Sequence, residues 1–204
     1  MSSINLREIL LGRPTRLRYI TRFSICPRTH DESVAEHSYY TAYIAMMLGL
    51  ALQADGITVN MGLVLTRALM HDVDESYSGD FIRMFKHSSL SLKLAIDNAN
   101  SGFVQKFCHD TGPGLPTLPE AWAFAKDATV EGAIVSLADF MSVVSYIIQE
   151  IKAGNHNMFE HLDDLRHFYD TFPKKAEKYA VLQNYIAQCG SLLNEIEVRK
   201  AEFQ

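Results

Sequence analysis

The sequence predicts an all-α protein that folds as a single-domain helical bundle over residues 1–204. Between Ala128 and Ile151, apolar residues recur at steps of three and four, which is the spacing of one helix face. Neither an internal repeat nor the strict alternation typical of strands occurs along the chain. Apolar residues make up 48% of the 204 residues, which is enough for one hydrophobic core.

Composition argues against several classes of protein. The net charge of −5 gives no support for a general nucleic-acid binder. The N-terminus has no basic region followed by an apolar one, so we expect no signal peptide and a cytoplasmic location. The uncharged stretch 38–54 is shorter than a membrane span and contains polar residues, so we expect a buried helix and no membrane partner. The cysteines are far apart and form no C-x-x-C pair, as is usual in a reducing cytosol: Cys26, Cys108 and Cys189.

The first elements of the chain are expected to be short. Residues 6–11 form an amphipathic segment, and Pro14 is well placed in the first turn of a second helix. Five arginines fall between residues 13 and 28, and a solvated surface position is the simplest interpretation for most of them. Arg22, which precedes Phe23, is the candidate for a phosphate contact, because a guanidinium group meets phosphate oxygens two at a time.

A long helix is expected to begin at Ser33. The Ser33-x-x-Glu36 spacing is that of a capping box, in which each side chain bonds the backbone of the other residue. This spacing explains Glu36 better than a catalytic role does. The helix should run to about residue 53 with His37 in its first turn, and a second buried helix should follow over residues 61–71.

The second helix ends in a histidine followed directly by an aspartate, and both groups are costly to bury. His71 and Asp72 point about 100° apart on a helix, so both reach one point only if it lies just off the surface. A bound metal suits that geometry, and Glu75 would join the same side if the helix continued. The alternative is a helix end with a dipole-stabilised histidine and a solvated acidic turn.

Beyond this helix the pattern becomes less regular. Residues 76–80 are typical of a turn, and helical spacing resumes at Phe81 and again in the 90s. Three of the six prolines lie between residues 111 and 119, so residues 98–125 are expected to be loop-rich, either a lid or a plain connection. Helices are then expected at 158–172 and 174–199, and their apolar faces favour a homo-oligomer.

Asp139 lies in the middle of the helix expected at about 128–151, which is apolar on both faces. A buried carboxylate needs a cation or several hydrogen-bond donors. Together with His37, His71 and Asp72, it makes a four-ligand set for a divalent first-row metal that keeps positions open for water and substrate. Such a metal lowers the pKa of bound water and polarises a phosphoryl oxygen.

The order of these residues, H…HD…D, is the signature of the HD-domain phosphohydrolases, which this chain resembles. Three blocks are similar to the bacterial YfbR-like 5′-deoxynucleotidases and to phage HD enzymes that hydrolyse dATP: residues 16–23, residues 33–38, and residues 71–75 with Ser78-Gly79-Asp80. The resemblance is specific over residues 13–86 and the helix of Asp139, and weak elsewhere. It implies an HD-type bundle and a deoxynucleotide substrate.

The resemblance also implies a role for individual residues. The metal, which would be Zn, Co or Mn, would be held by His37, His71, Asp72 and Asp139. Glu75 would be the catalytic carboxylate, and Arg22 would bind the phosphate next to the sugar. Phe23 stands where the family carries a tryptophan against the sugar, and the remaining substrate contacts would be made by Asp80, Ile25 and Lys86. For Lys86 a solvated position is the default.

Two departures from the family pattern bear on base and sugar selectivity. Phe23 replaces the tryptophan, and residues 80–86 lack the prolines that often follow the Gly-Asp pair. The leading hypothesis is a metal-dependent phosphohydrolase that acts on deoxynucleoside 5′-phosphates, releasing phosphate from a monophosphate or acting on a triphosphate. The rivals are a degenerate HD module that binds a nucleotide without catalysis, and a helical interaction protein with a structural metal.

Overall fold

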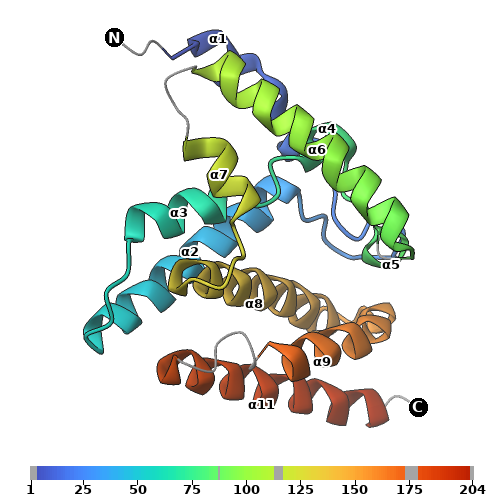
Figure 1. The fold of residues 1–204 in the computed structure, drawn as a ribbon. Coiled ribbons are helices and arrows are strands. Elements are labelled where there is room, and N and C mark those ends of the chain that lie inside the picture. The colour runs from blue at the N-terminus through green and yellow to red at the C-terminus, as the bar shows by residue number, and fades with distance from the viewer. Residues whose placement is uncertain (1–3, 87, 113–116, 173–178, 203–204) are drawn as a thin grey trace.

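A computed structural model describes residues 4–86, 88–112, 117–172 and 179–202. Every regular element within those ranges is a helix, which confirms the predicted all-α class. Figure 1 shows a central pair of long helices with one group of helices above it and another below. The chain packs α2 (Val34–Ala54) and α3 (Met61–Met70) against α8 (Val130–Lys152).

Helix α8 is the core of the molecule. Val135 and Ile147 are completely buried, and so are Ala45 of α2 and Val64 of α3, which belong to the same apolar cluster. Within the described ranges, α8 alone has the length and apolar composition that would allow it to cross a membrane. However, 67% of its most apolar window is buried inside the protein, as expected for a core helix.

The far side of α8 is covered by the C-terminal elements (Figure 1): η2 (His156–His161), α9 (Leu162–Thr171) and α11 (Ala180–Glu202). The helix expected over residues 158–172 is therefore a short 3₁₀ helix followed by an α-helix. The rings of Phe140 and Phe168 stack with their centres 4.2 Å apart. The start expected at residue 174 lies outside the described residues, and the homo-oligomer stays a prediction.

The other group of helices contains the segment expected to be loop-rich, and that expectation is wrong for most of it. Helix α6 (Leu90–Thr111) continues through residues 98–102, and α7 (Thr117–Ala123) follows, while residues 113–116 lie outside the described part. Short polar residues are poor helix formers, but tertiary contacts override that preference here. Buried Val104 and Cys108 of α6 pack in a second apolar cluster with Met70 and Val73.

The same group contains three short N-terminal and central elements: α1 (Leu6–Leu11), α4 (Glu75–Ser78) and α5 (Arg83–Lys86). The helix expected at Pro14 is the 3₁₀ helix η1 (Arg13–Tyr19). After η1 the chain pairs briefly with the segment before α2, because Val34 N–H donates to Ile20 O and Arg22 N–H donates to Glu32 O, each at 2.9 Å. This pairing places Arg22 beside the start of α2.

The capping box predicted at the start of α2 is present. The Ser33 side chain accepts a hydrogen bond from Glu36 N–H at 3.2 Å, and the Glu36 carboxylate accepts one from Ser33 N–H at 2.7 Å. Glu36 thus has the structural role that its spacing indicates. The cap fixes where the helix begins, and so it fixes the position of His37 in the first turn.

Glu150, near the end of α8, holds the connection that follows Pro27. Its carboxylate is 2% exposed and accepts four hydrogen bonds of 2.7–2.8 Å, from Thr29 N–H, Thr29 Oγ1, His30 N–H and Asn155 Nδ2. Burial opposes ionisation, but the hydrogen bonds from Thr29 and Asn155 hold the pKa of Glu150 below its usual value.

We expect Glu150→Gln to lower the free energy of unfolding by about 2 kcal/mol, because an amide cannot accept all four bonds. Urea denaturation at neutral pH measures this loss, with Glu195→Gln, at an exposed position of α11, as the matched control. The pKa of Glu150 is lower in the folded protein than in the unfolded chain, so its carboxylate stabilises the fold at a pH above the unfolded-state pKa. This stabilisation is lost as the pH falls through the folded-state pKa. The difference between the wild type and Glu150→Gln should therefore shrink in acid. Equal stability at neutral pH would contradict the assignment.

Candidate metal centre and active site

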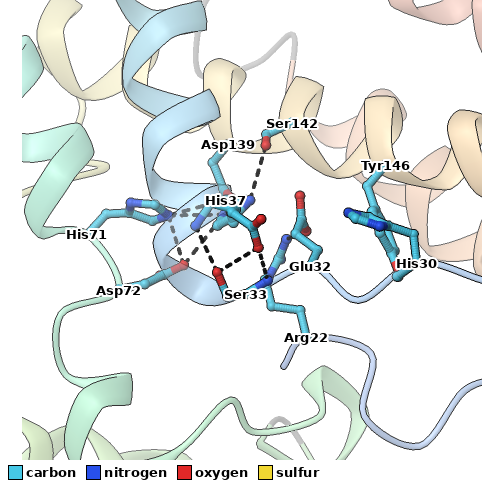
Figure 2. Close-up of polar contacts among 11 residues, drawn as sticks. Arg22, His30, Glu32, Ser33, His37, His71, Asp72, Asp139, Ser142 and Tyr146 are labelled. Carbon is cyan, nitrogen blue, oxygen red and sulfur yellow. Dashed lines mark hydrogen bonds and ion pairs between the residues drawn. The ribbon is translucent and has the colours of Figure 1, made fainter. Parts of the chain in front are cut away.

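Four side chains, from α2, the end of α3 with the turn after it, and α8, lie close together, as Figure 2 shows. His37 lies in the first turn of α2, His71 is the C-cap of α3, Asp72 follows it, and Asp139 is in α8. His37 Nε2 is 2.9 Å from Asp139 Oδ1, and His71 Nε2 is 2.9 Å from Asp72 Oδ2. The two Nε2 atoms are 3.3 Å apart. Sequence spacing alone could not show this convergence.

The second nitrogen of each imidazole has its own partner, which fixes how the ring is turned. His71 Nδ1 lies 2.7 Å from the carbonyl oxygen of Ala68, and His37 Nδ1 lies 3.1 Å from Ser142 Oγ. A carbonyl oxygen only accepts, so His71 Nδ1 carries a hydrogen and donates it. In metal sites this kind of outer hydrogen bond leaves the other nitrogen free to bind the ion. Both Nε2 atoms point into the cluster.

Burial and neighbouring charges shift the pKa values of the two histidines in opposite directions. Burial lowers the pKa of His37 to about 4, and the nearby Arg22 charge acts in the same direction. Burial also opposes protonation of His71, but the adjacent Asp72 carboxylate outweighs it and raises the pKa of His71 to about 9. Burial opposes ionisation of Asp139 as well, yet Lys126 and the histidines hold its pKa well below the usual value.

The donor set fits a divalent cation. Two imidazole nitrogens and two carboxylates are ordinary ligands for Zn²⁺, Co²⁺ or Mn²⁺. Donor atoms around such an ion lie about 3 to 3.5 Å apart. His37, His71 and Asp72 each offer a donor atom within 4.8 Å of the others, and Asp139 Oδ1 lies 2.9 Å from His37 Nε2 and 3.7 Å from His71 Nε2. The side chains of Asp72 and Asp139 remain 19% and 21% exposed, so the cluster is partly open to solvent.

Glu75 lies in a short separate helix, and not in a continuation of the helix that His71 caps. Helix α3 ends at Met70, residues 71–74 form turns, and Glu75 begins the short helix α4. Its Oε2 atom is buried and has no hydrogen-bond partner among the described residues. Burial and the charges of Asp72 and Asp80 raise the pKa of Glu75 well above its usual value. A carboxylate oxygen in that state is available to a water molecule or to substrate.

Arg22 lies beside the cluster, near the start of α2 (Figure 2). It donates to buried Glu32 at 2.8 Å, and its side chain is 14% exposed. Desolvation opposes its charge, but Glu32, Asp72 and Asp139 raise the pKa of Arg22, so it remains a cation. Asp80 interacts with Arg22 as well. Burial raises the pKa of Asp80, and the positive charge of Arg22 only partly opposes this rise. A guanidinium group has five N–H donors, so the bond to Glu32 leaves others for a phosphate.

Phe23 adopts the left-handed backbone conformation, with φ at 53°, which is uncommon outside glycine. Its ring stacks on Tyr146 at 5.2 Å and meets the edge of His161 at 5.1 Å. The guanidinium carbon of Arg22 is 5.5 Å from the centre of the ring. These contacts hold the Phe23 ring beside Arg22, next to the residues that follow α8.

Comparison with known proteins agrees with this geometry. The family model described as 5′-deoxynucleotidase YfbR-like matches residues 11–178, which is most of the chain. The chain belongs to the YfbR-like 5′-deoxynucleotidase family. This assignment confirms the family and the phosphohydrolase class that the sequence predicts.

Individual relatives are similar over part or most of their length. The dATP triphosphohydrolase of Salmonella phage PMBT28 is 32% identical over 106 residues, covering 48% of this chain and 54% of the phage enzyme. A 5′-deoxynucleotidase of Vibrio cholerae is 23% identical over 183 residues, 79% of this chain and 91% of that one. The match thus spans about half of the phage relative and most of the bacterial one.

Two solved structures show that the fold is shared. The PH0347 protein from Pyrococcus horikoshii superposes with a TM-score of 0.74 at 21% identity, covering 92% of this chain and 99% of that one. An HD-domain phosphohydrolase from Listeria innocua gives 0.65 at 21% identity, covering 92% and 98%. At such identities the likeness concerns the fold alone, and it supports the predicted HD-type bundle.

Two of the predicted substrate residues of this YfbR-like chain, Ile25 and Lys86, are more exposed than the residues of the four-ligand cluster. The Ile25 side chain is 67% exposed, beyond the buried part of the site. Lys86 is partly exposed and sits 3.9 Å from Asp97, although its charge acts on the pKa of Asp80. Their roles toward a base and a phosphate remain predictions.

The structure adds residues that the sequence reasoning missed. Lys126 Nζ binds Asp139 Oδ2 at 2.7 Å, and the charges of Asp139 and Asp72 outweigh desolvation and raise the pKa of Lys126. Nothing in its sequence surroundings marks it, because it lies in the turn before α8. Ser142 was detectable, since it lies three residues after Asp139 on the same helix face.

A third missed group supports the turn that carries Glu75. Buried Asp74 accepts hydrogen bonds from Asn100 of α6 at 2.5 Å and from Trp122 of α7 at 2.8 Å. Burial raises the pKa of Asp74, and the bond from Trp122 counteracts this effect. The segment expected to be loop-rich, as a lid or a plain connection, therefore holds the 71–75 turn in place.

Ser142→Ala should weaken binding of Zn²⁺ or Co²⁺ about tenfold, because it removes the partner of His37 Nδ1 while leaving all four ligands. Competition with a chromophoric chelator measures the dissociation constant. Ser145→Ala, which changes an exposed serine one turn later, is the matched control and should leave the affinity unchanged. Equal affinities in the two variants would show that Ser142 does not orient the ligand.

Proposed function

We propose that this protein is a metal-dependent phosphohydrolase that removes phosphate from deoxynucleoside 5′-phosphates. The observation that carries the proposal is the four-donor cluster of His37, His71, Asp72 and Asp139 beside the unpaired, buried oxygen of Glu75. Family membership supports the nucleotide substrate. A purely structural metal would need neither a free carboxylate nor an arginine beside the cluster.

In this proposal the cluster holds Zn²⁺, Co²⁺ or Mn²⁺, which supplies Lewis acidity toward a phosphoryl oxygen and toward water. Glu75 Oε2 accepts the proton of the attacking water, and burial makes this carboxylate a stronger base. Arg22 binds the phosphate and neutralises charge that develops on its oxygens in the transition state. Lys126 is a second cation beside Asp139, on the same cluster.

Selectivity for the nucleoside would come from the same N-terminal segment. The Phe23 ring, fixed between Tyr146 and His161, would offer an apolar surface to the deoxyribose. The Asp80 carboxylate, held by a hydrogen bond from the Phe23 backbone, would accept one from a sugar hydroxyl. Exposed Ile25 would lie against the base, where an aliphatic side chain discriminates weakly.

A second candidate activity is dATP triphosphohydrolysis. It is favoured by one observation, the 32% identity to the phage enzyme, which exceeds the identity to the bacterial 5′-deoxynucleotidase. The two activities would use the same metal cluster and differ in whether a monophosphate or a triphosphate is the substrate. The products from dATP therefore identify the second activity: tripolyphosphate and deoxyadenosine if the phosphorus next to the sugar is attacked, as in a monophosphate, or dADP and orthophosphate if phosphate is removed stepwise.

We expect a panel of nucleotides to give orthophosphate from deoxynucleoside 5′-monophosphates in the presence of Co²⁺, Mn²⁺ or Zn²⁺. The panel contains the four dNMPs, the matching ribonucleotides and the four dNTPs, and products are resolved by anion-exchange chromatography. A chelator should abolish the activity, and adding the metal back should restore it. Absence of phosphate release from every nucleotide with every metal would exclude the enzyme hypothesis.

Glu75→Gln should lower kcat about 10² to 10⁴-fold, because the amide cannot accept a proton from water. Glu36→Gln is the matched control, since glutamine also completes a capping box and should leave kcat unchanged. Isothermal titration with a dNMP should show that Glu75→Gln still binds nucleotide. Full activity in Glu75→Gln would overturn the assignment, whereas a wild type that binds without turnover would favour the nucleotide-sensor alternative.

A further inference from the structure

A second cluster of metal-ligating atoms lies outside the His37, His71, Asp72 and Asp139 set. It joins Cys26, in the connection between η1 and α2, to Glu160 and His161 at the end of η2. Cys26 Sγ is 3.1 Å from His161 Nε2 and 3.4 Å from Glu160 Oε1, and the latter two atoms are 3.6 Å apart. We propose that these three residues bind a second divalent cation, with Zn²⁺ as the ion that the donors suit best.

The triangle of donor atoms has the size that a tetrahedral zinc ion needs. Bonds of about 2.3 Å to sulfur and about 2.0 to 2.2 Å to nitrogen and oxygen place the ligand atoms roughly 3.3 to 3.6 Å apart. The three distances lie between 3.1 and 3.6 Å, so an ion fits after a shift of less than about half an ångström. One thiolate, one imidazole and one carboxylate together are ordinary ligands of Zn²⁺.

Exposure across the cluster is graded in a way that suits ion entry. Cys26 is buried at 6% exposure, the His161 side chain is 21% exposed, and the Glu160 side chain is 62% exposed. An ion could enter from the Glu160 side, and water could complete its coordination there. Hydrogen bonds can also join the three groups, because the Cys26 thiol can donate to Glu160 while His161 Nε2–H donates to Cys26 Sγ. The size of the donor triangle and its three ligand types are what favour a metal ion.

The rival interpretation is a reactive cysteine activated by histidine. Cys26 is buried and its thiol faces the Glu160 carboxylate, which is an unfavourable place for attack on an external molecule. A metal ion, by contrast, replaces the thiol proton and binds all three donors at once. Metal binding is therefore the function that the geometry favours.

The cysteine is held in position before any ion binds. Cys26 N–H donates to Phe23 O at 2.9 Å, and Arg28 Nη1 donates to the carbonyl oxygens of both residues at 3.3 Å. Asn155, which precedes η2, donates to Pro27 O at 2.9 Å. These bonds tie the connection to the segment that carries Glu160 and His161, so little order needs to be gained on binding.

An ion at this place would fasten the substrate-facing segment to the C-terminal elements. The His161 ring already touches the edge of the Phe23 ring, and Phe23 directly follows Arg22. The ion would hold Phe23 in its left-handed conformation without contacting the reacting phosphate. We therefore assign it a structural role, distinct from that of the four-donor cluster.

Cobalt spectroscopy on the full chain tests this proposal independently of any activity. The four-donor cluster has no sulfur, so a thiolate-to-Co²⁺ charge-transfer band in the near ultraviolet can come only from a cysteine ligand. We expect wild-type protein loaded with Co²⁺ to bind two equivalents and to show the band. Cys26→Ser should bind one equivalent of Co²⁺ and should not show the band. Cys189→Ser, which changes a buried cysteine elsewhere, should still bind two equivalents and show the band.

Two further variants keep the result interpretable. His161→Ala should also lose the second equivalent, and its far-ultraviolet circular dichroism should match that of the wild type. His71→Ala, which removes a ligand of the other cluster, should retain the charge-transfer band. The proposal is overturned if the folded wild type binds a single Co²⁺ without the band, or if the band persists in Cys26→Ser. Neither outcome would alter the test of phosphohydrolase activity.

Discussion

The burial of two imidazoles against two carboxylates is the constraint around which the three central helices are arranged. An isolated polar group in this environment would cost several kcal/mol, so α2, α3 and α8 can pack closely only because their polar groups face one another. Well-packed apolar residues would hold such a junction at least as firmly. The buried polar groups thus lower stability relative to an apolar core, and a binding or catalytic role explains why they are there. The hydrogen bonds of the two histidines to Ala68 and Ser142 keep both Nε2 atoms directed into the cluster.

Side chains of both charges surround this junction. Four carboxylates, from Asp72, Glu75, Asp80 and Asp139, are offset by Arg22 and Lys126, and each cation has its pKa raised by the carboxylates around it. An additional dication would relieve the remaining negative charge. The segment that brings Arg22 to this place includes a residue in a strained conformation, whose cost of about 1–3 kcal/mol is offset by local hydrogen bonds and ring contacts.

The helices on the other side of the cluster support it rather than cover it. Asn100 and Trp122 both donate to Asp74, which lies in the turn between the histidine-aspartate pair and Glu75. The turn is anchored by this buried carboxylate and by Val73, which is buried in the second apolar cluster. Positioning of Glu75 is therefore a tertiary property, which links α6 and α7 to the chemistry although neither contributes a ligand.

Local signals in the sequence determined the all-α class, the capped start of α2, the C-terminal position of His71 on its helix and the position of Asp139 in the middle of a buried helix. Each of these depends on neighbours within about one or two helical turns, where propensity, capping and periodicity act. Tertiary structure alone decided that the four donors converge, that α6 continues through polar residues 98–102, that Lys126 pairs with Asp139, and that Cys26 meets His161. These outcomes depend on the angles at which helices cross and on partners up to 135 residues away, which no local pattern encodes.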